Sequence, residues 1–161
     1  MSLKEALLET FNTNFVAYLH SHIAHVNVMG RNFMSDHKLL GKIYEDLQGE
    51  IDKLAELLRT LDEFMPHDLR SILSGSSISD YPVVGESEDL LQGVYTDLTD
   101  LCNSYKATQA AADDEGHSEI SNYAQDRILA IGKFQWMIRS TIGNYVEEPE
   151  EFDVFNALEI E

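Results

Sequence analysis

Positive charge is scarce in this sequence. Its 161 residues include 11 Lys and Arg against 29 Asp and Glu, which gives a formal net charge of −18. Binding to nucleic-acid phosphates requires clustered cations, and only the amino terminus and Lys4 supply them before the first helical pattern. We therefore expect no direct DNA binding. The acidic balance favours cations as partners, although high solubility is an equally simple explanation.

Cysteine and long apolar runs are almost absent too. The single Cys102 excludes a disulfide within the chain and is compatible with a reducing compartment. No apolar run approaches the length of a membrane span, and the first residues form a helical pattern without the apolar core of a signal peptide. We expect a cytoplasmic protein with no membrane partner. A hydrophobic fraction of 43% over this length suits one domain with a sizeable core.

With only three prolines and nine glycines, long helical patterns remain uninterrupted in the N-terminal half. One apolar stripe advances in steps of three and four residues through Phe11, Phe15, Tyr18, His22, His25 and Met29. A second stripe runs through Phe33, His37, Leu40, Tyr44, Leu47, Ile51, Leu54, Leu58 and Leu61. We expect Asn27 and Gly30 to close the first helix and Pro66 to stop the second.

The C-terminal half predicts two further helices after a long connection. Residues 62–85 are rich in Ser, Gly and Asp, with room for a short helix over 67–73 and an extended stretch at 81–84. The third helix begins near the acidic residues 86–89 and breaks at 113–116, and the fourth ends near Gly143 and Asn144. This order predicts an all-α fold, a ferritin-like four-helix bundle with a long crossover. The bundle domain spans residues 1–145, and we expect the acidic tail 146–161 to fray or pack on it rather than dock elsewhere.

Two histidines and two acidic residues on the long helices form a candidate set of metal ligands. Imidazole and carboxylate are ligands of non-haem iron and zinc sites, and His25, His37, Asp52 and Glu56 supply them. His37 and Asp52 fall on one predicted helix, where a rise of about 1.5 Å per residue separates them by about 22 Å. They cannot hold one ion within one chain. A shared site therefore requires two subunits packed about a two-fold axis.

Each part of this set also has a simpler explanation. A buried histidine bonded to a carbonyl is commoner than a metal ligand, and we weigh the two equally for His22, His25 and His37. The helix face that carries both acids is typical of a solvated face, and its members are Gly41, Glu45, Gln48, Asp52, Glu56 and Arg59. Glycine destabilises a helix interior, so Gly41 and Gly49 favour a close approach of another backbone, as at a two-fold contact.

The spacing of these residues resembles the signature of the Dps-type mini-ferritins. The matching pattern is His25-x-Asn27-x-x-Gly30-x-x-Phe33-x-x-x-His37, followed by Tyr44 and then by Asp52-x-x-Ala55-Glu56. The run Lys-Phe-Gln-Trp-Met-Ile at 133–138 and the acidic break at 113–115 resemble the last part of that family's chain. The likeness extends over most of the sequence, from about Thr10 to Ile142.

The resemblance implies a fold, an assembly and an activity. In this family the two imidazoles come from one subunit and the two carboxylates from its two-fold mate, which agrees with the separation argued above. It implies a homo-oligomer, a dodecameric hollow shell, that oxidises Fe(II) with hydrogen peroxide or O2 and stores ferric iron inside. A mono-iron or di-iron ferroxidase site would then be built from His25, His37, Asp52 and Glu56.

The family also lines its three-fold pores with carboxylates. The residues of this sequence that match that description cluster around the start of the last helix, and they are Asp113, Asp114, Glu115, Glu119 and Asp126. Like charges placed so closely repel one another, and a pore that conducts cations gives that repulsion a function. The simpler explanation is an acidic helix start that complements the helix dipole.

Three positions depart from the family pattern. Val26 stands where a tryptophan commonly follows the first histidine, and Leu57 stands where an arginine commonly follows the glutamate. Gly41 stands where an aspartate commonly follows the second histidine by one turn. The missing carboxylate predicts weaker or altered iron binding, which Glu45 on the next turn compensates only if it reaches the ion. These departures keep open a shell or scaffold protein that has lost ferroxidase activity, whereas a DNA-compacting protein is disfavoured by charge.

Overall fold

The computed structural model describes residues 1–143, so the acidic tail 146–161 lies outside the described residues. Within them the chain forms five helices and no strand. The helices are α1 (Leu3–Asn27), α2 (Phe33–Thr60), α3 (Leu69–Ser74), α4 (Ser87–Glu115) and α5 (Ser118–Ile142). The prediction of an all-α four-helix bundle is confirmed, and α3 lies where the sequence predicts a short helix in the crossover.

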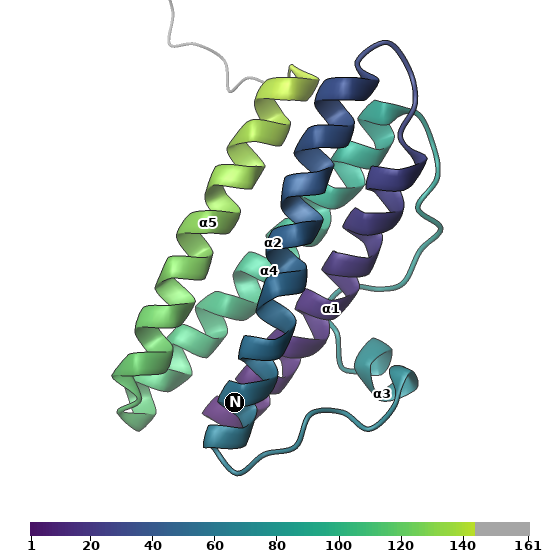
Figure 1. The fold of residues 1–161 in the computed structure, drawn as a ribbon. Coiled ribbons are helices and arrows are strands. Elements are labelled where there is room, and N and C mark those ends of the chain that lie inside the picture. The colour runs from purple at the N-terminus through teal and green to yellow at the C-terminus, as the bar shows by residue number, and fades with distance from the viewer. Residues whose placement is uncertain (144–161) are drawn as a thin grey trace, which may run out of the picture.

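Four long helices lie side by side, with the crossover running along them (Figure 1). α1 packs against α2 and α4, and α4 packs against α5, whereas α2 makes few close backbone approaches to α4 or α5. α2 ends at one end of the bundle and α4 begins at the other, so residues 61–86 must travel its full length (Figure 1). α2 and α4 therefore run in the same direction, as in bundles with one long crossover. None of the described helices is long and apolar enough to cross a membrane.

Local capping sets most helix ends. Ser2 and Glu5 bond reciprocally at the start of α1, which satisfies two of the amide groups left free there. Gly116 and Gly143 adopt the left-handed conformation after α4 and α5, and glycine reaches it without a side-chain clash. α4 ends within the predicted break at 113–116: the acidic residues 113–115 form its last turn, and Gly116 ends it.

α2 ends earlier than its sequence pattern predicts. Its last residue is Thr60, so Pro66 is not what stops it. Asp62 takes a positive φ of 59°, and its N–H donates to the carbonyl of Arg59 in the last turn. Aspartate tolerates this left-handed conformation better than most residues do, so it serves here in place of the usual glycine.

The apolar core confirms the leucines of the stripe predicted for α2, whereas Phe33 at its start is exposed. The side chains of Leu40, Leu47, Leu54 and Leu58 are fully buried, and they meet buried leucines of α4 between the long helices. Burial of side chains of this kind stabilises the fold by about 1.5–3 kcal/mol each. The regular leucine spacing thus fixes which side of α2 faces inward and which side carries Asp52 and Glu56.

The most buried side of α1 is not its predicted apolar stripe. Phe15, Tyr18, His22 and His25 lie half-buried, and Met29 is exposed. The fully buried side instead mixes small, polar and apolar residues, among them Thr10, Asn14, Ala17, His20, Ser21 and Ala24. α1 contacts α2, α3 and α4, so it is covered on several sides and a one-sided apolar pattern does not describe it.

Candidate metal centre

His25 and His37 lie together where α1 ends and α2 begins. His25 Nδ1 lies 2.8 Å from the carbonyl oxygen of His37, and His37 Nδ1 lies 2.8 Å from the carbonyl oxygen of His25. A carbonyl oxygen can only accept, so both Nδ1 atoms carry a proton and donate it. In a neutral ring the other nitrogen, Nε2, then keeps its lone pair free for a metal ion.

The two imidazole rings stack on each other, with centroids 3.8 Å apart and 21° between their planes. Hydrogen bonds at the far nitrogen orient metal-binding histidines and raise their basicity, and here both rings have such a bond before any ion arrives. The two explanations weighed for these histidines are therefore compatible. The carbonyl bonds use Nδ1 and leave Nε2 available.

Gly41 of α2 provides the room for His25. A Cβ atom at position 41 would lie 3.1 Å from His25 Cε1 and 3.2 Å from its Nδ1, so a larger residue would press on the ring. Gly49, by contrast, has no neighbouring atom within 4 Å of such a Cβ. Within the chain, Gly41 thus admits an imidazole ring, and the approach of another subunit's backbone stays a prediction.

Aromatic rings continue from the histidine pair along both helices. Phe33 stacks on His37 with centroids 4.9 Å apart, and Tyr44 lies 4.8 Å from His25. Tyr44 also stacks on His22 at 4.3 Å with 9° between the planes. These flat neighbours restrict the rotation of both candidate ligands. Val26 is exposed.

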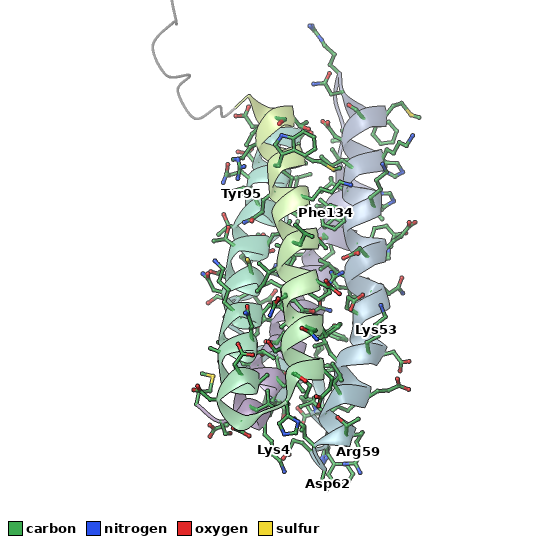
Figure 2. The ribbon with its side chains drawn as sticks, turned by 90° about the vertical axis from the view of Figure 1, so that its left-hand side faces the viewer. Lys4, Lys53, Arg59, Asp62, Tyr95 and Phe134 are labelled. Carbon is green, nitrogen blue, oxygen red and sulfur yellow. The ribbon has the colours of Figure 1, made fainter. Side chains whose placement is uncertain are left out.

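Asp52 and Glu56 lie on the half of α2 that is remote from the histidine pair. Both are exposed, and neither makes a hydrogen bond or ion pair with any residue of the described chain. Lys53 lies between them in sequence, but its ammonium contacts Glu50 at 2.8 Å. Figure 2 shows Lys53 on the part of α2 that leads to Asp62, towards the end of the bundle that holds Lys4. Two carboxylates on this face are thus available to an ion or to another subunit.

The acidic residues inside the bundle are already paired. Asp46 and Glu50 both contact Arg127 of α5, and Glu50 accepts a hydrogen bond of 2.6 Å from Tyr123. Burial raises the pKa of Glu50, but the hydrogen bonds from Lys53 and Tyr123 and the charge of Arg127 outweigh it and lower the pKa overall. These carboxylates neutralise a buried guanidinium and do not form a metal cage.

Within the described residues, a single chain does not assemble the candidate metal ligands into one site. Among residues 1–143, no group of three His, Cys, Asp or Glu side chains is placed to hold a metal ion. His25 and His37 come together, whereas Asp52 and Glu56 stay apart from them, as the spacing along α2 requires.

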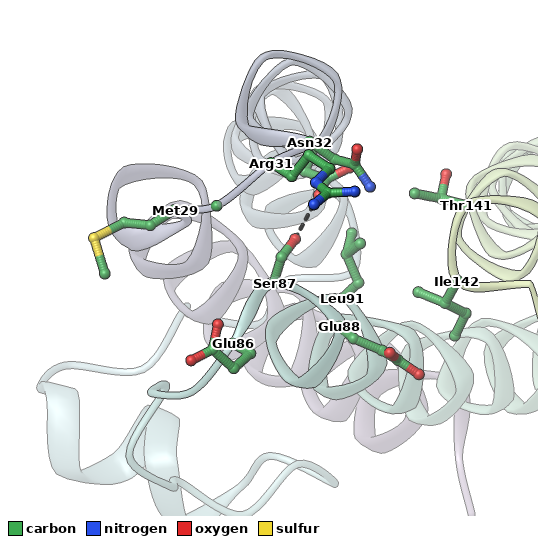
Figure 3. Close-up of a pocket in the computed structure, with 11 residues that line it drawn as sticks. Met29, Arg31, Asn32, Glu86, Ser87, Glu88, Leu91, Thr141 and Ile142 are labelled. Carbon is green, nitrogen blue, oxygen red and sulfur yellow. Dashed lines mark hydrogen bonds between the residues drawn. The ribbon is translucent and has the colours of Figure 1, made fainter.

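A pocket lies where the turn between α1 and α2 meets the start of α4 and the end of α5 (Figure 3). Ser87, the first residue of α4, donates a hydrogen bond to the buried carboxylate of Asp36, the neighbour of His37 in sequence. This bond ties the start of α2 to the start of α4. The pocket lining combines the guanidinium of Arg31 with carboxylates that include Asp36 and Glu88, and no three metal-ligating side chains of the described residues are placed to hold an ion.

The most deeply buried histidine, His20, was missed by sequence reasoning. Its Nδ1 lies 2.9 Å from Asp97 of α4, and its Nε2 lies 3.3 Å from Asp80 of the crossover. Burial lowers the pKa of His20, but the hydrogen bonds and charges of Asp97 and Asp80 outweigh it and raise the pKa overall. The run of small and polar residues on this side of α1 was the only sequence signal that polar groups are buried here.

The five candidate pore carboxylates gather around the turn between α4 and α5, and all are exposed. Asp113, Asp114 and Glu115 form the last turn of α4, and Glu119 lies in the first turn of α5. Asp126 follows about two turns later. Acidic residues at a helix C-terminus oppose the helix dipole, so a favourable helix start accounts for Glu119 and not for the three residues of α4.

Two of these carboxylates have roles within the chain. Glu115 accepts a hydrogen bond of 2.7 Å from the backbone N–H of Leu3 and so helps to cap α1. Glu119 lies 3.1 Å from His117 Nδ1, and backbone and His117 hydrogen bonds lower its pKa. Variants that test the cluster should therefore keep Glu115, because replacing it would also remove a cap of α1.

Comparison with known proteins adds sequence and structural relatives to this geometry. A family model of the ferritin-like domain matches residues 4–146. General stress protein 20U of Bacillus subtilis (strain 168) is 26% identical over 149 residues, which cover 88% of this chain and 100% of that protein. A DNA protection during starvation protein of Brevibacillus brevis is 29% identical over 126 residues, which cover 78% of this chain and 84% of that protein.

The solved structures show the same arrangement of helices. The crystal structure of a DPS protein from Vibrio cholerae O1, described as a member of a broad superfamily of ferritin-like diiron-carboxylate proteins, superposes with a TM-score of 0.82 at 26% sequence identity. The superposition covers 87% of this chain and 88% of that one.

Proposed function

The chain belongs to the ferritin-like family, as a Dps-type mini-ferritin, and from this premise we propose that it oxidises Fe(II) and stores the ferric product. The site would lie between two subunits, with His25 and His37 of one copy facing Asp52 and Glu56 of its two-fold mate. Fe(II) is the substrate there, and hydrogen peroxide or O2 is the oxidant. The product moves inward and is held in a hollow shell, for which we propose twelve copies in the cytoplasm.

One observation carries this proposal: the reciprocal carbonyl bonds of His25 and His37. They leave two Nε2 lone pairs on imidazoles that are already oriented. The absence of partners for Asp52 and Glu56 within the described chain supports the second half of the site. Two-fold symmetry joins such halves without bending α2, because an isologous contact brings each patch to its counterpart twice.

The residues fit the chemistry of iron oxidation. Each Fe(II) loses one electron, and hydrogen peroxide accepts two electrons and two protons to form two molecules of water. Carboxylates neutralise the charge that rises on the metal and suit the harder ferric ion, while imidazole binds either oxidation state. The protein brings ions and oxidant together, so its contribution is binding and orientation.

Replacing the carboxylates tests the site directly. The double variant Asp52→Asn and Glu56→Gln keeps the shape of both side chains but removes their charge, so rapid Fe(II) oxidation should be abolished while the assembly stays intact. Stopped-flow absorbance measures the rate, and light scattering measures the mass. Glu88→Gln, which removes an exposed charge from α4, should oxidise Fe(II) as fast as the parent. Unchanged rates in the double variant would place the chemistry elsewhere.

Complementation tests whether the site is shared between subunits. A variant without both histidines and a variant without both carboxylates should each be inactive alone. Co-expressed, half of the two-fold dimers are mixed, and each mixed dimer holds one complete site, so about a quarter of the parent activity should return. A site within one chain would give no recovery, because each copy would still lack half of its ligands.

A shell that has lost ferroxidase activity is the second candidate function. Gly41 favours it, since it stands where the family commonly has an aspartate, so the proposed site is short of one carboxylate. An assembled parent protein with bound metal but no measurable oxidation would decide for this candidate. Gly41→Asp would then test whether the missing carboxylate is the cause.

A further inference from the structure

A buried ionic cluster joins α1, α4 and the crossover, separate from the candidate metal centre. His20 is 1% exposed, and its ring packs against Tyr81 with centroids 4.4 Å apart. Its two nitrogens face two carboxylates, Asp97 of α4 at 2.9 Å and Asp80 of the crossover at 3.3 Å. Tyr81 also donates a hydrogen bond of 3.0 Å to Asp97. Two consecutive residues of the crossover are thus held by one imidazole and one buried carboxylate.

The number of protons on His20 decides how many of these bonds exist. A carboxylate only accepts, so each ring nitrogen needs its own proton, and a neutral imidazole has one N–H where the imidazolium ion has two. Asp97 is 2% exposed and makes the shorter bond, so a neutral ring keeps its proton on Nδ1. Nε2 then turns a lone pair towards Asp80, and the two acceptors repel each other.

We propose that His20 is a proton-controlled latch, which binds the crossover to the bundle when the ring carries two protons and releases Asp80 when it carries one. The hydrogen bonds and charges of both carboxylates outweigh burial and raise the pKa of His20 above its usual 6.5. Because the folded pKa lies above the unfolded one, the stabilisation is complete below about pH 6.5 and is lost as the pH rises through the folded pKa.

The surroundings of the ring contain negative charge from two elements. From α4 it faces Asp97, with Asp100 one turn further, and burial together with the charge of Asp97 raises the pKa of Asp100. From the crossover it faces Asp80 and Tyr81, and burial and Asp97 raise the pKa of the Tyr81 hydroxyl far above the neutral range. The imidazolium ion is thus what offsets the carboxylates of this cluster.

Release of the latch has a structural consequence in the crossover. Ile78 and Val83 flank Asp80 in sequence, and both are buried in the core cluster. With Asp80 unbound, this segment is held by fewer contacts, so its backbone amides should exchange with solvent more readily. The readout is local and does not depend on iron chemistry.

Hydrogen–deuterium exchange of the full chain, measured by mass spectrometry from about pH 6 to about pH 9 and divided by the intrinsic rate at each pH, tests the latch. Protection of residues 77–85 should fall with rising pH in the parent, while peptides from the contact between α4 and α5 stay constant. Asp80→Asn removes one exposed carboxylate, so the midpoint should move to lower pH. Tyr81→Phe is the matched control, which should lower protection at every pH and keep the pH dependence.

Two results would overturn the latch. One is constant protection of residues 77–85 over the whole pH range in the parent protein. The other is an Asp80→Asn midpoint equal to that of the parent, because the second carboxylate would then play no part. In the His20→Gln variant, protection of residues 77–85 should not change with pH. If this variant does not fold, the midpoint of the surface variant Asp80→Asn still tests the latch.

Discussion

Gly41 and Gly49 lie on the same helix, two turns apart, in different surroundings. Helix propensity alone favours alanine at both positions, because glycine loses more backbone freedom on folding. Around Gly41 the ring of His25 occupies the space that a methyl group would need, whereas Gly49 faces open space. The first glycine is therefore explained by the histidine pair, and the second is not explained by any contact within the chain.

This difference gives a prediction at the residue scale. Gly49→Ala should raise the free energy of unfolding by about 0.5–1 kcal/mol, the usual gain in a helix interior. Gly41→Ala should gain less, because its new methyl group presses on His25. Urea unfolding followed by circular dichroism compares the two. Equal gains would show that His25 shifts aside without cost.

At the scale of elements, α2 and α5 are joined mainly through side chains. Their backbones approach each other closely at few points, and the space between them is bridged by the buried Arg127. Asp46 and Glu50 neutralise this guanidinium from α2. Burial raises the pKa of the nearby Tyr105 to about 12, so its hydroxyl stays neutral and adds no charge to this network.

The contact between α2 and α5 predicts which of two cations contributes more to the free energy of unfolding. Arg127→Met should lower the free energy of unfolding by about 3–5 kcal/mol, since it leaves buried carboxylate without its partner. Lys53→Met removes the other cation beside Glu50, but Lys53 is 61% exposed, so its loss should cost less than about 1 kcal/mol. Chemical unfolding of both variants measures the difference, and similar losses would mean that the guanidinium is not the main support of this contact.

At the scale of the whole molecule, the net charge of −18 includes a cluster of exposed carboxylates to which we assign a function in iron uptake. The side chains of Asp113, Asp114 and Asp126 make no hydrogen bond or ion pair within the described residues and lie near the turn between α4 and α5. An exposed acidic cluster raises the local concentration of cations, and this effect weakens with salt.

Neutralising that cluster should slow iron uptake. In the triple variant Asp113→Asn, Asp114→Asn and Asp126→Asn, uptake at low Fe(II) concentration should fall, and the difference from the parent should be larger at low ionic strength. Glu115 is left in place because it caps α1. Metal binding at the histidine pair should persist. Equal uptake by variant and parent at every salt concentration would show that iron takes another route.

The same net charge predicts that the assembly does not bind DNA directly. Without clustered cations it lacks the phosphate contacts that supply nonspecific affinity, so it should not shift duplex DNA at physiological salt in the presence of a chelator. An electrophoretic mobility assay measures this. A shift in chelator would contradict the prediction, whereas a shift that appears only with divalent metal would indicate ions bridging two acidic surfaces.

The sequence by itself determined the long helices and the candidate ligands that they carry. The leucine spacing of α2 fixes its buried side, because a helix of 3.6 residues per turn places every third or fourth residue on one face. The same regularity separates His37 from Asp52 along the helix axis, so spacing alone shows that a single ion bound by both would need a second subunit. These inferences need only the periodicity and rise of a single helix, and both follow from the positions of residues along the sequence.

Only the tertiary structure decided which polar groups meet across helices. The reciprocal bonds of His25 and His37, the cap that Glu115 provides for Leu3, and the contact of His20 with Asp97 all join residues from different elements. Such contacts depend on the rotation of each helix about its own axis and on the path of the crossover. α1 is covered on several sides, so its apolar stripe does not predict that rotation. The burial of His20 and its contacts with acidic residues therefore follow only from the packing of the helices and the crossover.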